Sequence, residues 1–254
     1  AGYPLVALAD EFDPFAASEA TSDSSTLEFL AEAREVPPGE PFHVLIKITH
    51  PPGWHSYFIN PGYVGTSLRP NWELPPDFQV ERVGWPTPHI GSTAGKKTYG
   101  YEPSVSHLFK VTPPADLPPG TPMKIAASPR WQICDESNCR PEPGIGVPET
   151  ISTVTVNVGS AVMTIAANTP AFTDARAMLP SELPSGVKVE ALKTPDEITL
   201  ILSPATAVPA GDIHFYDFEQ VLDAQSNPVV IRGGEEVRCC LLYTSDAADE
   251  LCRV

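Results

Sequence analysis

Two cysteines in the middle of this sequence, Cys134 and Cys139, have a type and spacing that could do chemistry. The residues between them, 135–138, read Asp-Glu-Ser-Asn and are all of types that favour turns. An extended chain would hold the two Cα atoms about 16 Å apart, whereas a disulfide needs them about 4.4–6.8 Å apart. The segment must therefore fold back as a hairpin for the two sulfurs to join, and its composition favours that turn.

A cysteine pair at this spacing could be a reversible dithiol or only a structural staple. On the chain-entropy model so small a ring stabilises a fold by about 2 kcal/mol, which adds little to a chain that builds its own core. A zinc site would need further ligands, and no second cysteine pair or His-x3-His stands at zinc spacing. Thiolates also suit Cu(I), but no Met-rich or His-rich run accompanies the pair. The spacing favours a reversible dithiol and leaves the other interpretations open.

The neighbours of the two cysteines predict which sulfur is the more reactive. Cys139 is followed by Arg140, whereas Cys134 is followed by Asp135. A cation favours the thiolate that reacts in disulfide exchange, and a carboxylate disfavours it. We therefore expect Cys139 to be the more reactive sulfur.

The composition indicates an all-β protein with an acidic surface. The 254 residues include 30 prolines, with several Pro-Pro pairs, and proline at this density excludes long helices over most of the chain. Short strands joined by proline-rich turns fit better and predict a β-sandwich. The net charge of −16 argues against nucleic acids and anionic membrane surfaces as partners. No apolar run is long enough to span a bilayer.

Hydrophobic periodicity predicts the main elements. Alternating apolar residues predict strands at 42–49 and 151–158. One helix is predicted at 170–179, because Pro170 stands at its start and Pro180 follows its end. Three further strands are expected at 187–192, 197–202 and 212–216. The tryptophans next to proline could form a sugar-binding platform, but caps on a small sandwich core are the commoner role.

These elements predict four regions. Residues 1–26 are expected to be a flexible lead-in with a signal-peptide remnant, 27–160 a sandwich domain, and 161–238 a second small β-rich module. Residues 239–254 resemble the translation of an adapter used in sequencing libraries, so Cys239, Cys240 and Cys252 are not counted as evolved features.

Several short motifs follow one another over residues 27–160 in a characteristic order and spacing. They are Gly53-Trp-His-Ser-Tyr57, Asn60-Pro-Gly62, Trp72-Glu-Leu-Pro75, Trp85-Pro86, Tyr99-Gly-Tyr-Glu102 and the segment from Cys134 to Glu142. Together they resemble one family, the N-terminal periplasmic domain of the thiol:disulfide interchange protein DsbD and its ScsB-like relatives.

The resemblance implies an immunoglobulin-like sandwich in the periplasm with a redox-active cysteine pair and neither cofactor nor metal. Such a domain receives electrons from a membrane-embedded DsbD-type domain and passes them to thioredoxin-like periplasmic proteins through mixed disulfides. The resemblance also implies that Cys139 forms the mixed disulfide and that Cys134 resolves it. A tether to the inner membrane in a longer protein is compatible with this role.

The family also shields its cysteine pair with an aromatic residue on a short cap loop. In the matching position this sequence has Thr98, preceded by Lys96-Lys97 where the family has an acidic pair. Because Thr98 is not aromatic, Tyr99 or Tyr101 is expected to provide the shield instead.

A different class of function also fits the sequence. The chain could be a periplasmic binding or assembly module whose disulfide is only structural. A reduction potential separates the two, because structural disulfides of secreted proteins lie below about −300 mV and working ones lie higher.

Overall fold

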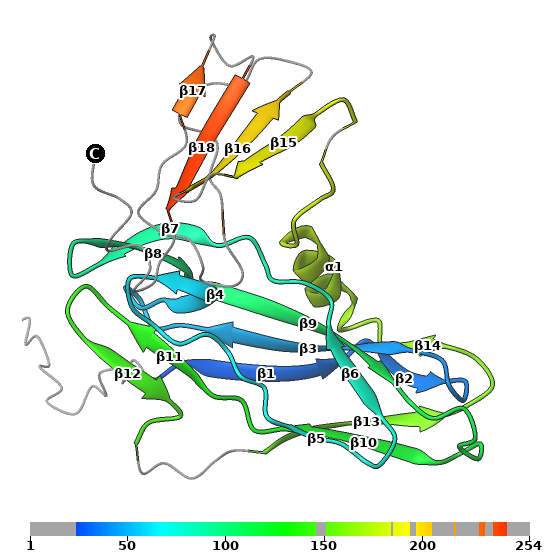
Figure 1. Cartoon of the computed structure of the whole chain (residues 1–254). Coiled ribbons are helices and arrows are strands. Elements are labelled where there is room, and N and C mark those ends of the chain that lie inside the picture. The colour runs from blue at the N-terminus through cyan, green and yellow to red at the C-terminus, as the bar shows by residue number, and fades with distance from the viewer. Residues whose placement is uncertain are drawn as a thin grey trace, which may run out of the picture.

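A computed structural model describes residues 24–145, 151–183, 185–193, 197–204, 216, 229–231 and 236–242. The described residues form strands in several sheets and one short helix, which confirms the predicted all-β sandwich (Figure 1). Of the lead-in predicted at 1–26, residues 1–23 lie outside the described part of the chain.

The first sheet of the sandwich contains the strand predicted at 42–49. Its order is β1-β3-β9-β6, with β1 at Thr26–Ala31, β3 at Phe42–Thr49, β9 at Ser104–Thr112 and β6 at Gln79–Arg82. Every second residue of β3 from Phe42 to Ile48 is buried in the main core, because side chains alternate between the two faces of a strand.

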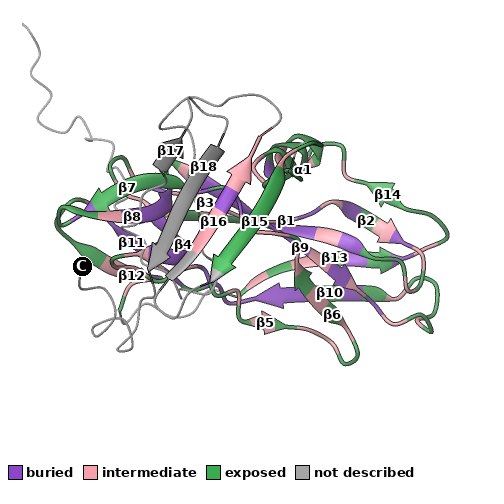
Figure 2. Ribbon diagram, turned by 45° about the horizontal axis from the view of Figure 1, so that its top comes forward, coloured by how far each residue is buried: buried purple, intermediate pink, exposed green. Residues whose placement is uncertain are grey.

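The second sheet packs across that core. Its order is β14-β2-β13-β10-β5, with β14 at Met163–Thr164, β2 at Ala33–Val36, β13 at Ser152–Val158, β10 at Pro122–Ala127 and β5 at Trp72–Glu73. Met123, Ile125 and Val156 contribute fully buried side chains from this sheet, and Figure 2 colours much of β10 as buried.

Two smaller sheets lie at one end of the sandwich. One has the order β4-β8-β7, with β4 at Ser56–Gly62, β8 at Lys96–Tyr101 and β7 at His89–Thr93. The other is the hairpin of β11 at Trp131–Cys134 and β12 at Cys139–Glu142. A two-residue bridge between His55 and Cys134 joins the hairpin to the start of β4.

The helix α1, at Thr169–Ala177, lies on the sandwich rather than apart from it. Phe172 and Ala175 are fully buried against Leu45 of β3 and Leu108 of β9, on the opposite face of the sheet from the main core. Like β14, α1 follows the domain boundary predicted after residue 160 and yet packs on the elements before it. That boundary stays a prediction, and the packing favours placing it after the helix.

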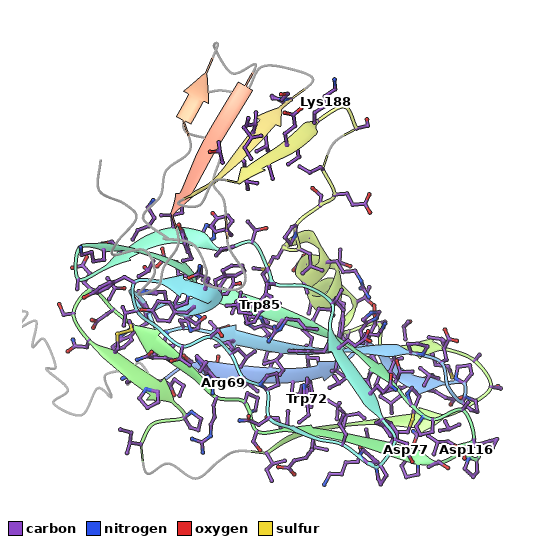
Figure 3. The ribbon with its side chains drawn as sticks, viewed as in Figure 1. Arg69, Trp72, Asp77, Trp85, Asp116 and Lys188 are labelled. Carbon is purple, nitrogen blue, oxygen red and sulfur yellow. A yellow bond between two sulfur atoms is a disulfide. The ribbon has the colours of Figure 1, made fainter. Side chains whose placement is uncertain are left out.

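A buried polar cluster lies between β6 and β9 (Figure 3 labels Trp85, which borders it). The Arg82 guanidinium carbon lies 3.8 Å from the centre of the Trp85 ring, and Arg82 Nη1 donates to His107 Nδ1 at 2.8 Å. Burial lowers the pKa of Arg82 to about 10 and the pKa of His107 well below its usual value. Tyr101 packs edge-on against His107 and donates a hydrogen bond to the Pro86 carbonyl at 2.8 Å.

A further sheet follows the helix. Its order is β15-β16-β18-β17, with β15 at Lys188–Lys193, β16 at Glu197–Ser203, β18 at Glu236–Leu242 and β17 at Val229–Ile231. The strands predicted at 187–192 and 197–202 are confirmed, whereas the one predicted at 212–216 lies outside the described residues except for Tyr216. Residues 239–242, assigned from the sequence to an adapter, pair with β16 as part of β18.

Tyr216 contacts the sandwich directly. Its ring centre lies 5.1 Å from that of Tyr99 and 5.9 Å from that of Phe58, and its hydroxyl donates to the Pro88 carbonyl at 3.2 Å. The Tyr216 ring is therefore held against β4 and β8 by aromatic contacts.

Replacing Tyr216 by Ala is expected to lower the free energy of unfolding by about 2 kcal/mol. The ring is half-buried, so the loss falls below the 3–5 kcal/mol of a fully buried aromatic residue. Urea unfolding followed by tryptophan fluorescence measures it. Tyr63→Ala is the control, because Tyr63 is 58% exposed. An equal loss in both variants would show that the Tyr216 contact has no stabilising role.

Candidate redox site

The two cysteines face each other across the β11–β12 hairpin. Cys134 and Cys139 are direct cross-strand partners and form a disulfide with a Cα–Cα distance of 4.1 Å (the yellow bond in Figure 3). The backbone of Asp135 bonds to that of Asn138 inside the pair, so the cysteines occupy the next, non-hydrogen-bonded position, where opposing side chains are closest. The hairpin predicted from the spacing is therefore confirmed.

The turn between the cysteines is held by Asp135. Its Oδ1 accepts hydrogen bonds from the backbone N–H groups of Ser137 and Asn138, at 2.7 and 2.6 Å. These bonds lower the pKa of the Asp135 carboxyl, first through Ser137 and then through Asn138. The turn that the residue types predict is therefore present. The Asp135 side chain stabilises it by accepting the hydrogen bonds that a backbone carbonyl accepts in other turns.

The two sulfurs differ in accessibility. Cys134 is fully buried, whereas Cys139 is exposed at the tip. An attacking thiolate approaches along the S–S axis, so this difference in exposure favours Cys139 as the attacked sulfur and Cys134 as the leaving group. The roles of the two sulfurs stay a prediction, which the asymmetry supports.

Arg140 supports this asymmetry less than the sequence suggests. Neighbouring residues of a strand point to opposite faces, so the Arg140 side chain leaves the hairpin on the face opposite the disulfide. Its guanidinium carbon lies 4.2 Å from the centre of the Trp54 ring, and its Nε lies 3.5 Å from Glu142 Oε1. Accessibility, rather than the charge of Arg140, is therefore the feature that distinguishes Cys139.

The three residues assigned from the sequence to the cap loop are all buried in β8. Thr98, Tyr99 and Tyr101 are exposed by 1%, 4% and 1%. Tyr101 is engaged with His107 and Pro86, and Tyr99 packs against Tyr216. Their shielding of the disulfide stays a prediction.

A cavity of about 280 Å³ lies beside the hairpin. Glu136 of the hairpin tip bounds it on one side, and β7 and β8 bound it on the other. Its remaining lining residues are Gly53, His55, His89, Ile90, Gly91, Ser92, Thr98, Gly100, Tyr101 and Glu102. Gly100, in this lining, allows β4 to approach β8 closely, because a Cβ atom at this position would collide with the Ser56 carbonyl oxygen.

His55 is the residue at this site that the sequence does not single out. Its backbone N–H and C=O both bond to Cys134 at 3.0 Å, so the two side chains point to the same face. The motif that contains His55 is visible in the sequence, but the pairing with a residue almost eighty positions away is not.

Within the described residues, no group of three or more His, Cys, Asp or Glu side chains could hold a metal ion. The one helix found in the described part of the chain is too short and polar to cross a membrane.

Comparison with known proteins relates this site to a family. Residues 26–144 match the family model described as "Thiol:disulfide interchange protein DsbD, N-terminal". A search of curated proteins found no match.

A search of solved structures found two that differ in their structural similarity to this chain. The crystal structure of the N-terminal periplasmic domain of ScsB from Proteus mirabilis is 18% identical, with a TM-score of 0.58 over 88% of this chain and 81% of that one. Spo0M, a sporulation control protein from Bacillus subtilis, is 11% identical over 70% of this chain and 78% of that one, and its TM-score of 0.26 is too low to indicate a shared fold. The hairpin disulfide lies within residues 26–144, the segment that matches the family model of the DsbD N-terminal thiol:disulfide interchange domain.

Proposed function

We propose that this protein carries electrons between proteins through the reversible Cys134–Cys139 disulfide. The observation that carries the proposal is the accessibility of Cys139 at the tip of a hairpin whose other sulfur is fully buried. A structural disulfide does not require an exposed cysteine, whereas thiol–disulfide exchange between proteins requires one that a partner can reach.

The exchange proceeds in two balanced steps. A thiolate of the electron donor attacks Cys139 Sγ, forms an intermolecular disulfide and expels Cys134 as a thiolate. A second thiolate of the donor then attacks the donor sulfur of that intermolecular disulfide and releases Cys139 as a thiolate. Two electrons have then moved to this chain, and the donor holds the disulfide.

The reduced pair repeats these steps in the opposite direction with an oxidised partner. Cys139 attacks the partner's disulfide, and Cys134 attacks Cys139 Sγ to release the partner with two thiols. We place this exchange in the periplasm, between a membrane-embedded DsbD-type donor and thioredoxin-like acceptors. The family of residues 26–144 and the periplasmic source of the similar ScsB domain support that placement.

The reduction potential tests the proposal. A variant with Cys239, Cys240 and Cys252 replaced by Ser leaves Cys134 and Cys139 as its only cysteines. Equilibration in glutathione or dithiothreitol buffers, followed by alkylation and mass spectrometry, gives its potential. We expect a value above about −300 mV, the range of working disulfides, and a lower value would assign the disulfide a structural role.

A further inference from the structure

The burial of Cys134 raises a problem that the two cysteines cannot solve by themselves. When a thiolate attacks Cys139, the electron pair of the S–S bond stays on Cys134, whose residue is fully buried in the disulfide state. A buried anion without a partner is strongly disfavoured and makes a poor leaving group. An efficient exchange therefore needs a group at Cys134 that stabilises the departing thiolate.

His55 lies next to Cys134, in a position from which its side chain could stabilise the departing thiolate. The reciprocal backbone bonds of 3.0 Å make it the direct cross-strand partner of Cys134, on the side away from Cys139. Directly opposed residues have Cβ atoms about 4.5–5.5 Å apart and side chains on one face. Cys139, Cys134 and His55 thus form one row across neighbouring strands.

The hydrogen bonds of the His55 ring are compatible with the tautomer that carries its proton on Nδ1. Its Nε2 lies 3.2 Å from Tyr57 Oη and 3.3 Å from Thr93 Oγ1. A hydroxyl that donates to Nε2 leaves the proton of the neutral ring on Nδ1. The Nδ1–H group is then the ring's remaining donor.

The charges around the ring decide its form at neutral pH. Burial lowers the pKa of His55, while the carboxylates of Glu102, which follows β8, and Asp135, from the hairpin tip, act in the opposite direction. The other titratable groups facing it are Tyr57 at Nε2, His50, and His89 and Glu136 across the cavity. Because burial prevails, the ring is neutral near pH 7 and acts as a hydrogen-bond donor.

We propose that His55 stabilises the thiolate of Cys134 by donating a hydrogen bond from Nδ1 during exchange at Cys139. This inference rests on the proposed function and adds a third residue to its machinery. No proton is transferred in the step: the electron pair moves from the S–S bond to Cys134 Sγ, and the Nδ1–H group stays on the ring. In the reverse direction the same bond holds the Cys134 thiolate beside the sulfur that it attacks.

Two substitutions of His55 test the inference in the variant that keeps only Cys134 and Cys139. His55→Phe removes the donor and keeps a flat ring, whereas His55→Gln keeps an N–H donor on a side chain of similar length. His43→Phe is the matched control, since His43 pairs instead with Glu32 and Arg176 beside α1. The measurements are the rate of reduction by glutathione and the pKa of Cys134, from thiolate absorbance after Cys139 is also replaced by Ser.

We expect His55→Phe to slow reduction about tenfold and to raise the pKa of Cys134 by about one unit, the equivalent shift in free energy. The Gln variant is expected to keep most of the rate, and the His43 control all of it. Equal rates and equal pKa values in the parent and the Phe variant would overturn the inference, as would a Gln variant as slow as the Phe variant. Circular dichroism checks folding, and His55→Ala replaces the Phe variant if the latter does not fold.

The outcome for the parent separates this inference from the proposed function. A parent that does not exchange with glutathione contradicts the function itself. A parent that exchanges normally while His55→Phe matches it contradicts only the role of His55.

Discussion

A Cys134→Ser variant is expected to accumulate mixed disulfides through Cys139, whereas Cys139→Ser accumulates at least about tenfold less, because its remaining thiol is buried and reacts only through local opening. In the first variant the exposed thiol still attacks a partner disulfide, but no second thiol releases the product. Both variants are made with Cys239, Cys240 and Cys252 already replaced by Ser. The intact mass after incubation with oxidised glutathione measures the adduct.

The same pair of variants can be applied to proteins. Thioredoxin-like periplasmic proteins replace glutathione, and non-reducing gels followed by mass spectrometry identify the trapped complexes. Equal trapping by the two variants would contradict the asymmetry of the site, and trapping only through Cys134 would reverse the assigned roles. The parent with both cysteines is the control and is expected to release its partners.

Acid is expected to destabilise the fold through His50. This side chain is 5% exposed, its Nε2 has no hydrogen-bond partner, and its Nδ1 lies 3.3 Å from Ser25 Oγ. Burial first, and then the charge of His55, lowers the pKa of His50 to about 4. Below pH 6.5 the unfolded chain takes up a proton at His50 that the folded chain does not, so stability falls with pH until about pH 4. The loss at the lower end is about 3 kcal/mol.

Urea unfolding at half-unit steps between pH 7 and pH 4 measures this contribution. The His50→Gln variant keeps a polar side chain without the titration, so its stability is expected to depend less on pH by about 3 kcal/mol over the range. Carboxylates titrate in both proteins and cancel in the comparison. Parallel curves for the two proteins would show that His50 does not contribute. His107, buried beside Arg82, also has a lowered pKa and acts in the same direction in both.

Local pattern was enough to predict the sandwich and the hairpin. The strand predicted at 42–49 is β3, and the helix predicted at 170–179 is α1 to within a residue or two at each end. The cysteine hairpin followed from turn residues and from the geometry of a disulfide. These features depend on neighbours in sequence, where alternation and turn chemistry are specific.

Register between distant strands could not be predicted in the same way. The pairing of His55 with Cys134 depends on how the start of β4 meets β11, and a shift by one residue would turn the imidazole to the other face. The ring of Phe172 against Leu45 likewise places α1 on the sandwich, although the sequence suggests that a new module begins before it.

The backbone bonds between Cys134 and His55 have a consequence for the reduced protein. These bonds, the β11–β12 ladder and the Asp135 turn do not involve the sulfur atoms, so we expect them to persist when the S–S bond is broken. The two thiols would then stay aligned at a high effective concentration, and closing the ring would require no conformational search. We therefore expect Cys134 to reach Cys139 sooner than a thiol diffusing from bulk solvent, and covalent complexes of the unmodified protein to be short-lived.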